Sequence, residues 1–217
     1  MEMILTEDGS HTLRAKQFDE IYHSRHGAIE ESMHVYIKAG LAACERKEIH
    51  IFEMGFGTGL NALLSWKYAD ENNLKIHYTG LELYPVPDDI ISQINYGDIL
   101  SGYGEKFKLL HQADWEKEIQ LSDNFTLTKL NASLTDVVLP NDVFNVVYFD
   151  AFAPTKQPEL WIADIFKKVY DMMNANGILA TYCSKSIVRK DMASAGFRVE
   201  KLQGPHGKRD MVRAWKD

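Results

Sequence analysis

A chain of 217 residues with 45% hydrophobic residues has enough apolar side chains for one packed domain, which excludes an intrinsically disordered protein. A net charge of −7 argues against indiscriminate nucleic-acid binding, and no apolar run is long enough to cross a membrane. The opening residues 1–8 lack the features of a signal peptide, and the cysteines Cys44 and Cys183 are not at metal-binding spacing. We therefore expect a cytoplasmic protein, by preference a monomer, that holds no metal and contacts no membrane.

The first 46 residues are predicted to form a small extension. Alternating residues around the turn Glu7-Asp8-Gly9-Ser10 predict a short β-hairpin. Apolar residues at helical spacing predict a helix from Ile29 to about Cys44. We expect residues 1–46 to pack on a main domain formed by residues 47–217.

The main domain opens with a buried strand over residues 49–52, followed by a glycine-rich turn and a helix from Leu60 to Tyr68. The glycines of this turn follow the spacing Gly-x-Gly-x-Gly. This spacing differs from the G-x-G-x-x-G of dinucleotide sites and is typical of methyltransferases that use S-adenosylmethionine (AdoMet). A carboxylate at Glu53 suits the cationic amino-acid part of AdoMet and would repel a pyrophosphate. The candidate cofactor-binding residues here are Glu53, Gly55, Phe56, Gly57, Thr58, Gly59 and Asn61.

A second strand is predicted over residues 75–83, and Glu82 at its end can accept hydrogen bonds from a ribose diol. A helix begins near Pro87, while residues 97–123 show no clear pattern. After a strand over residues 125–134, Ser133, or alternatively Asp114, is expected to contact the adenine of the cofactor.

The continuous apolar run 143–149 predicts a strand buried on both faces, and it ends at Asp150. An aspartate that leaves such a strand needs a partner, so Asp150 is the candidate catalytic residue and also a cofactor contact. The remaining predicted elements are a helix over residues 158–173 closed by residues 174–177, a strand over 178–183, a helix over 186–195, and strands over 197–202 and 211–215.

This alternation predicts an α/β fold with a doubly wound, mostly parallel seven-stranded sheet, the Rossmann-like type of class I AdoMet-dependent methyltransferases. Ligands bind beyond the carboxyl ends of the strands in such sheets. Glu53, Glu82 and Asp150 all fall at predicted strand ends, so we expect them to share one site.

Segments spread over nearly the whole chain resemble one family, the tRNA 5-methylaminomethyl-2-thiouridine methyltransferases, which comprise the methyltransferase domain of bifunctional MnmC and the stand-alone MnmD proteins. The most specific of them is Asp150-Ala151-Phe152-Ala153-Pro154. It continues the match of residues 148–149, and the other matching segments are 18–24 through Gly27, 30–32, 35–36, 53–61, 158–161, 177–182 and 207–211.

This resemblance implies AdoMet-dependent methylation of the exocyclic amine of 5-aminomethyluridine at the tRNA wobble position. Asp150 would orient the amine, and Phe152 and Tyr182 would stack on a flipped-out anticodon base, with Pro154 stiffening the loop. The FAD-binding oxidase half of MnmC has no counterpart in these residues, so neither FAD nor a metal is expected. Another enzyme would then have to supply the aminomethyl group.

The charge is unevenly distributed, because residues 185–217 contain nine basic and four acidic residues, a net charge of +5. A charged run is usually a solvated face. With the resemblance, it also suggests contacts between the phosphates of the anticodon region and the residues Lys185, Arg189, Lys208 and Arg209.

Two other classes of function remain open from the sequence. A small-molecule methyltransferase or an aminopropyltransferase would share the sheet and the acidic strand ends, but it would not need the basic segment. A non-catalytic module that binds RNA would not need Glu53, Glu82 and Asp150 together.

Overall fold

The computed structural model describes all 217 residues. An eight-stranded sheet forms its centre, in the order β10-β11-β9-β8-β4-β5-β7-β6. Strands β4, β5, β7, β8 and β9 are parallel, and β11 is antiparallel to both β9 and β10. The strands are β4 (Glu48–Met54), β5 (Lys75–Leu81), β6 (Glu118–Ser122), β7 (Phe125–Leu130), β8 (Phe144–Phe149), β9 (Met173–Thr181), β10 (Arg198–Gln203) and β11 (Asp210–Trp215).

The predicted fold class is confirmed, with one strand more than expected. The additional strand, β6, lies within the segment 97–123 that gave no clear pattern, and it pairs antiparallel with β7 at the edge of the sheet. Its side chains are exposed or only partly buried, so the strand lacks the apolar alternation by which a half-buried strand is recognised.

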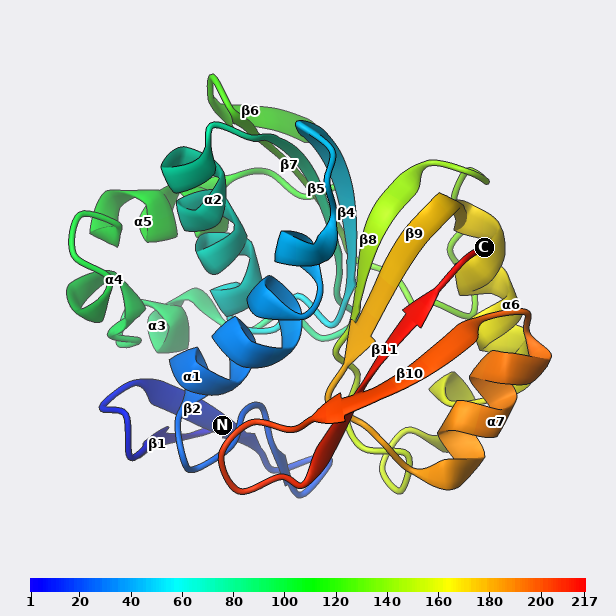
Figure 1. The fold of residues 1–217 in the computed structure, drawn as a ribbon. Helices are drawn as coiled ribbons and strands as arrows, with labels where there is room; N and C mark the ends of the chain where they lie inside the picture. The colour runs from blue at the N-terminus through cyan, green and yellow to red at the C-terminus, as the bar shows by residue number, and fades with distance from the viewer.

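Helices cover both faces of the sheet (Figure 1). Helices α1 (Ala28–Ser32), α2 (Leu60–Asn72) and α5 (Gly104–Gln112) lie on one face, and α6 (Ala163–Met172) and α7 (Ser186–Ser194) on the other. Four of the shorter elements are α3 (Asp88–Ile91), α4 (Tyr96–Ile99) and the 3₁₀ turns η2 (Leu41–Ala43) and η3 (Pro158–Leu160). No helix combines the length and the apolar character needed to span a membrane.

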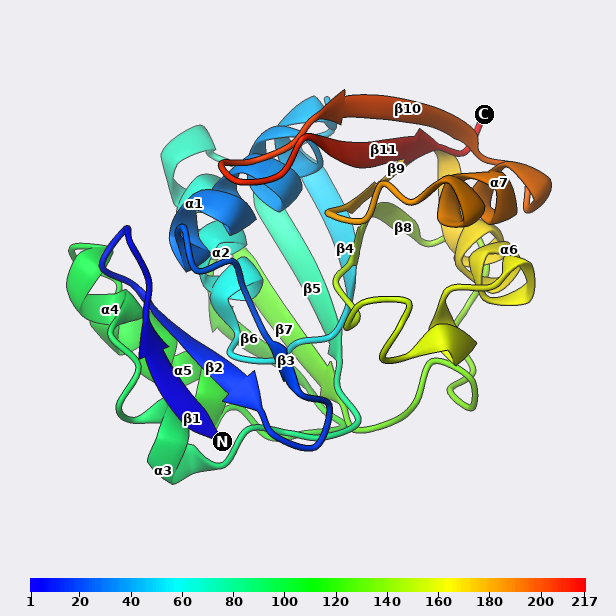
Figure 2. The same cartoon turned by 90° about the horizontal axis from the view of Figure 1, so that it is seen from below.

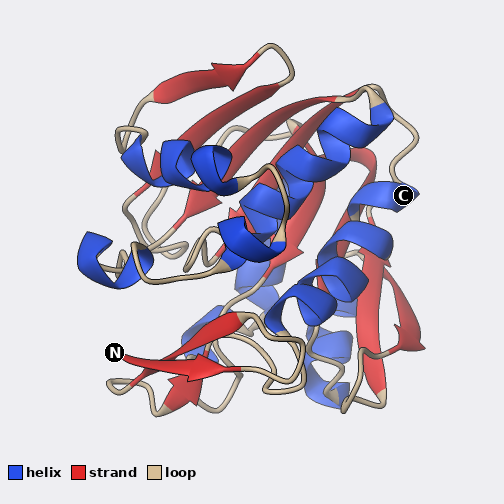
Figure 3. Cartoon of the chain, turned by 90° about the vertical axis from the view of Figure 1, so that its left-hand side faces the viewer, coloured by secondary structure: helices blue, strands red, loops and turns tan.

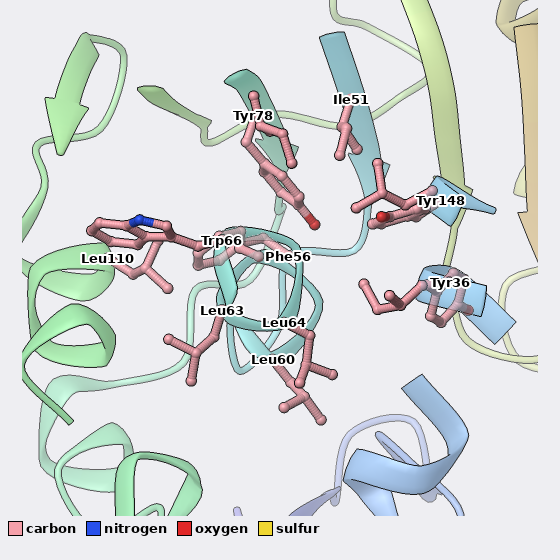
Figure 4. Close-up of a cluster of buried hydrophobic side chains, with 14 of the residues drawn as sticks. Tyr36, Ile51, Phe56, Leu60, Leu63, Leu64, Trp66, Tyr78, Leu110 and Tyr148 are labelled. Atoms are coloured by element: carbon pink, nitrogen blue, oxygen red, sulfur yellow. The ribbon is translucent and has the colours of Figure 1, made fainter. Parts of the chain in front are cut away.

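Alternation along the strands produces two cores, one on each face of the sheet. On β4, Ile49 and Ile51 belong to the core beneath α2, whereas Phe52 and Met54 belong to the core beneath α6. Figure 4 shows Ile51 and Tyr78 pointing from their strands toward α2. Each buried side chain of this size contributes ~1.5–3 kcal/mol, so these cores fix the strand ends that carry the site.

The N-terminal extension forms its own three-stranded antiparallel sheet of β1 (Glu2–Leu5), β2 (His11–Ala15) and β3 (Glu20–Ile21). This confirms the predicted hairpin. The sheet lies across the edge where the parallel strands end, as Figures 2 and 3 show. The extension therefore covers the region where ligands bind in this fold.

Several boundaries differ from the sequence prediction: the strand expected over residues 125–134 ends at Leu130, the helix expected from residue 158 begins at Ala163, and two further differences change the type of an element. The helix expected over residues 29–44 becomes a π-helix, η1 (Met33–Lys38), after α1 and ends before Gly40. Residues 174–177 do not close a helix but form the start of β9, where Asn174 donates to Val143 O and Lys216 N donates to Gly177 O. Pairing with neighbouring strands outweighs the local turn preference of these residues.

Candidate active site

A cavity of about 490 Å³ opens at the carboxyl edge of the parallel strands. Its walls come from the glycine turn after β4, the ends of β5, β8 and β9, the N-terminal extension and the loop between β10 and β11. Of the predicted site residues, it brings together Glu53, Gly55, Phe56, Gly57, Thr58, Asn61, Glu82, Asp150, Phe152, Tyr182 and Lys208.

The glycine turn has the conformation that its spacing predicts. Gly55 and Gly57 adopt φ angles of 92° and 51°, which glycine reaches with little steric penalty. A Cβ on Gly55 would lie 2.6 Å from Asp150 O, and one on Gly57 would lie 3.0 Å from the Tyr22 ring. A side chain at Gly55 would therefore clash with the backbone after β8, and one at Gly57 would press on the Tyr22 ring in the cavity wall.

A hydrogen-bonded network joins two carboxyl groups in the cavity. Asn61, in the first turn of α2, donates from Nδ2 to Glu53 Oε1 (2.8 Å) and to Asp150 Oδ2 (3.0 Å). Tyr36 donates its hydroxyl to Asp150 Oδ1 (2.5 Å). Tyr36 lies on η1, and π-helical turns are frequent at functional sites. Asp150 thus has the partner that its position required.

Burial sets the protonation of these carboxyl groups. It raises the pKa of Asp150 to about 7, against the hydrogen bonds from Tyr36 and Asn61, which favour the carboxylate. Burial, together with the charge of Asp150, raises the pKa of Glu53 well above its usual value. The pKa of Glu82 is also raised by burial, although backbone N–H groups bond its carboxylate. Asp150 can therefore gain or lose a proton near neutral pH.

Two buried acceptors in this network, Glu53 Oε2 and Asn61 Oδ1, lack a hydrogen-bond partner, although the Tyr78 hydroxyl lies close enough to Glu53 to favour its carboxylate. Buried polar atoms are nearly always hydrogen-bonded, so this pair indicates a ligand that donates hydrogen bonds. Glu82 accepts from Gly57 N (2.9 Å) and from Tyr84 N (2.8 Å), which leaves a second acceptor position on each of its oxygens.

Aromatic side chains from the N-terminal extension form one wall of the cavity. The rings of Phe18 and Tyr22 lie 4.8 and 5.2 Å from that of Phe152, and Tyr84 lies 5.6 Å from Phe18. Sequence reasoning identified Phe152 but missed the other three as site residues. The available signal was the match to family segment 18–24, which contains Phe18 and Tyr22.

Lys208, which the sequence analysis expected to contact tRNA phosphates, lies in the wall of the cavity. Its Nζ lies 2.5 Å from Glu31 Oε1 on α1 and 4.3 Å from the centre of the Tyr182 ring. The Tyr182 hydroxyl donates to Ala151 O (2.9 Å). The charge of Lys208 is thus largely neutralised by the carboxylate of Glu31, which is 177 residues away in the sequence.

The other three residues expected to contact tRNA phosphates do not line the cavity. Arg209 is exposed over 93% of its side chain, Lys185 is exposed before α7, and Arg189 donates to Ser184 O (3.2 Å). Pro154 lies outside the cavity-lining set, as does Gly59, which serves as the N-cap of α2. Five basic residues of the segment 185–217 lie within 3.1 Å of a carboxylate, but only Glu31 and Asp142 lie outside the segment, so most of its net positive charge remains.

Neither candidate for the adenine contact lines the cavity. Ser133 bonds with Thr135 (2.7 Å) in the loop after β7, and Asp114 is exposed and paired with Lys117 (2.8 Å). The loop folds back on itself because Ser133 satisfies its hydroxyl locally.

One group of side chains could hold a metal ion. Glu7, His26 and His206 offer ligand atoms that lie within 4.8 Å of one another, at the surface beside the cavity. Glu7 and His26 already form a hydrogen bond of 3.0 Å. Of the three, only His26 lines the cavity.

A family model described as S-adenosyl-L-methionine-dependent methyltransferase matches residues 104–217, more than half of the chain. The chain belongs to this methyltransferase family. It is 30% identical over 95% of its length to the tRNA 5-methylaminomethyl-2-thiouridine biosynthesis bifunctional protein MnmC of Marinomonas sp., and 28% identical over 98% to that of Cupriavidus metallidurans. The methyltransferase spans about a third of the length of these relatives, 32% and 33%.

Two solved structures extend the comparison. MNMC2 from Aquifex aeolicus superimposes on 98% of the methyltransferase and 69% of its own chain, with a TM-score of 0.80 and 28% identity. Spermidine synthase from Thermotoga maritima covers 96% of the methyltransferase and 69% of its own chain at a TM-score of 0.58, but with 11% identity, so it shares the fold alone.

Proposed function

We propose that the methyltransferase uses AdoMet to methylate the exocyclic amine of 5-aminomethyluridine, or its 2-thio form, at the wobble position of tRNA. The observation that carries this proposal is Asp150, a carboxyl group with a pKa of about 7 held beside the glycine turn by Tyr36 and Asn61. Such a group suits an amine as methyl acceptor. The names of the relatives, which match nearly the whole chain, support the choice of tRNA. A tRNA substrate would place the enzyme in the cytoplasm.

The polar groups at the glycine turn fit AdoMet. The unpartnered acceptors Glu53 Oε2 and Asn61 Oδ1 suit its cationic amino group, and Glu82 has free acceptor positions for a ribose diol. The positive φ angles of Gly55 and Gly57 leave room for close backbone approach. When bound, AdoMet supplies an electrophilic methyl group on a positively charged sulfur.

The residues of the chain then have to orient the amine and handle its proton. Only the free-base amine has a lone pair to attack with, and the carboxylate of Asp150 can accept a hydrogen bond from its N–H. The nitrogen becomes an ammonium when its bond to the methyl group forms, and Asp150 can take up the released proton. Alignment of the reacting atoms can lower the barrier by on the order of 7–11 kcal/mol.

The test is methyl transfer from labelled AdoMet to tRNA from cells in which 5-aminomethyluridine accumulates. Nucleoside analysis of the product should show 5-methylaminomethyluridine at the wobble position. Transfer that occurs equally with tRNA lacking the aminomethyl group would contradict the proposal. Transfer of an aminopropyl group from decarboxylated AdoMet to a small amine would instead identify an aminopropyltransferase.

A further inference from the structure

An ion pair in the cavity wall, in which Glu31 is buried and the Lys208 side chain is 35% exposed, has no role in the chemistry described so far. Glu31 on α1 is only 6% exposed, and its carboxylate pairs with Lys208 from the loop between β10 and β11. Removing the Glu31 carboxylate from water costs free energy, and an apolar contact of similar size would join these elements equally well. The position of the pair in the cavity wall therefore suggests that a ligand uses it.

Both charged groups are held in place. Glu31 accepts a second hydrogen bond from Ser24 N at Oε2 (2.6 Å). The ammonium of Lys208 lies over the Tyr182 ring, which is itself fixed by its hydroxyl bond to Ala151 O. An ammonium has three N–H donors and a carboxylate about four acceptor positions, so each retains capacity for a ligand. The pair offers a donor and an acceptor side by side, 2.5 Å apart.

We infer that Glu31 and Lys208 recognise the Watson–Crick edge of the uracil ring, with Lys208 donating to O4 and Glu31 accepting from N3–H. Uracil presents a carbonyl oxygen next to an N–H, which complements an ammonium next to a carboxylate. Cytosine presents the reverse pattern, because its N3 lone pair would face Glu31 and its amino group would face Lys208. This inference rests on the proposed function, and it assigns the subsite that selects uracil as the base of the wobble nucleotide.

The location of the pair agrees with this assignment. O4 is bonded to the carbon next to C5, which carries the aminomethyl group, so the two must be recognised close together. Both residues are close enough to Asp150 to change its pKa: the charge of Glu31 raises it and the charge of Lys208 lowers it. Tyr182 and Phe152 line the same cavity, so aromatic rings lie beside the position proposed for the flipped-out base.

The experiment uses anticodon stem-loop RNAs with 5-aminomethyluridine, 5-aminomethylcytidine or N3-methyl-5-aminomethyluridine at the wobble position. For the wild-type enzyme, kcat/KM should be about 10- to 100-fold lower with either altered base, as is typical for loss of base-edge hydrogen bonds. In Glu31→Gln, the amide can donate to N3 of cytosine, so the preference for uridine over cytidine should shrink to about threefold or less. Lys208→Met should lose the same preference, and Lys208→Arg should restore part of it.

Two controls separate recognition from structure. Melting temperature and AdoMet affinity report whether each variant is folded, and Lys201→Met removes an ion pair with Asp210 (2.9 Å) outside the cavity without changing the base preference. If Glu31→Gln and Lys208→Met lower kcat/KM equally for all three RNAs, the pair only ties α1 to the loop and the inference is wrong. If the wild-type enzyme methylates none of them, the proposed function itself fails and this inference with it.

Discussion

Asp150 combines a partly buried position with a pKa raised to about 7, and each of its oxygens accepts one hydrogen bond. A carboxylate is acceptor-only and has room for further hydrogen bonds, so it can meet an amine without losing Tyr36 or Asn61. Its negative charge matters most when the amine becomes cationic. Its contribution should therefore appear in the rate of methyl transfer more than in cofactor binding.

Asp150→Ala tests this expectation. We expect the affinity for AdoMet to stay within a few-fold, while the rate of methyl transfer falls by ~10²–10³, which is typical for loss of a preorganised charge-stabilising group. Calorimetry and single-turnover methylation measure the two quantities. Near-normal turnover would mean that another residue orients the amine.

Tyr36→Phe should change the pH dependence of the reaction. The hydroxyl of Tyr36 donates to Asp150, so its loss destabilises the carboxylate and raises the pKa of Asp150 further. The acidic limb of the profile of kcat/KM should then move to higher pH, with most activity retained at pH well above neutrality. Tyr148→Phe, whose hydroxyl bonds with Ser65 (3.0 Å), is the matched control and should leave the limb unchanged. An identical profile for Tyr36→Phe would show that the bond does not set the charge of Asp150.

Gly57→Val should abolish AdoMet binding and leave the protein folded. The new side chain would have to adopt φ of 51° and would lie against the Tyr22 ring inside the cavity. Gly102→Ala is a matched control, because Gly102 also has positive φ, 84°, but no atom within 4 Å of the added Cβ. Calorimetry should show binding only in the control. Equal affinity in both variants would place the cofactor elsewhere.

At the scale of elements, the cavity is lined partly by the central sheet and partly by the N-terminal extension and the loop between β10 and β11. The extension and this loop supply Phe18, Tyr22, Tyr36, Glu31 and Lys208 to a cavity whose other wall is the glycine turn. The proposed boundary between residues 1–46 and 47–217 therefore divides residues that line the same cavity.

Contacts with tRNA phosphates should come from cations that have no close carboxylate. Lys185 precedes α7 and is exposed, and Arg209 is almost fully exposed with Asp210 no closer than 3.9 Å. Replacing both with alanine should reduce the slope of log affinity against log salt by ~0.7–0.9 for each lost contact. Lys216→Ala, which removes a cation already paired with Asp142 (2.7 Å), should leave the slope unchanged. If the double variant also keeps the wild-type slope, tRNA binds on another face.

For the whole molecule, the raised pKa of Asp150 predicts a loss of stability with rising pH. The folded protein keeps a proton on Asp150 up to pH about 7, whereas an unfolded aspartate loses it near pH 3.8. The contribution of this group to the free energy of unfolding therefore decreases between these values, by at most ~1.4 kcal/mol per pH unit. The burial that raises the pKa of Asp150 in the site therefore lowers the stability of the folded protein as the pH approaches 7.

Asp150→Asn tests this effect together with the smaller one on Glu53, whose pKa is raised by the charge of Asp150. The buried His23 and His111, whose pKa values are lowered to about 4, act in the opposite direction but are common to both proteins. The difference in free energy of unfolding between variant and wild type, measured with urea and no ligand, should grow as pH rises from 4 to 7. A difference that stays constant would mean that Asp150 titrates at an ordinary value in the folded protein.

The sequence by itself determined the sheet, the glycine turn and the acidic strand ends. The structure of residues 47–61 and 143–150 could be predicted because it depends on local properties of the sequence. These are the apolar alternation, the fully apolar run before Asp150 and the positive φ angles that glycine allows. Polar edge strand β6 was missed because its side chains are largely solvated and carry little of that pattern.

Only the tertiary structure decided which distant residues share the cavity. In the sequence, Lys208 cannot be told from a surface lysine. Its proposed role depends on Glu31, which lies 177 residues away and is brought near by the packing of α1 against α2. Tyr36 similarly acquires its bond to Asp150 across 114 residues. Local pattern encodes which face of an element is buried, whereas contacts between elements depend on the packing of the whole chain, and the charge state of Asp150 follows from that packing.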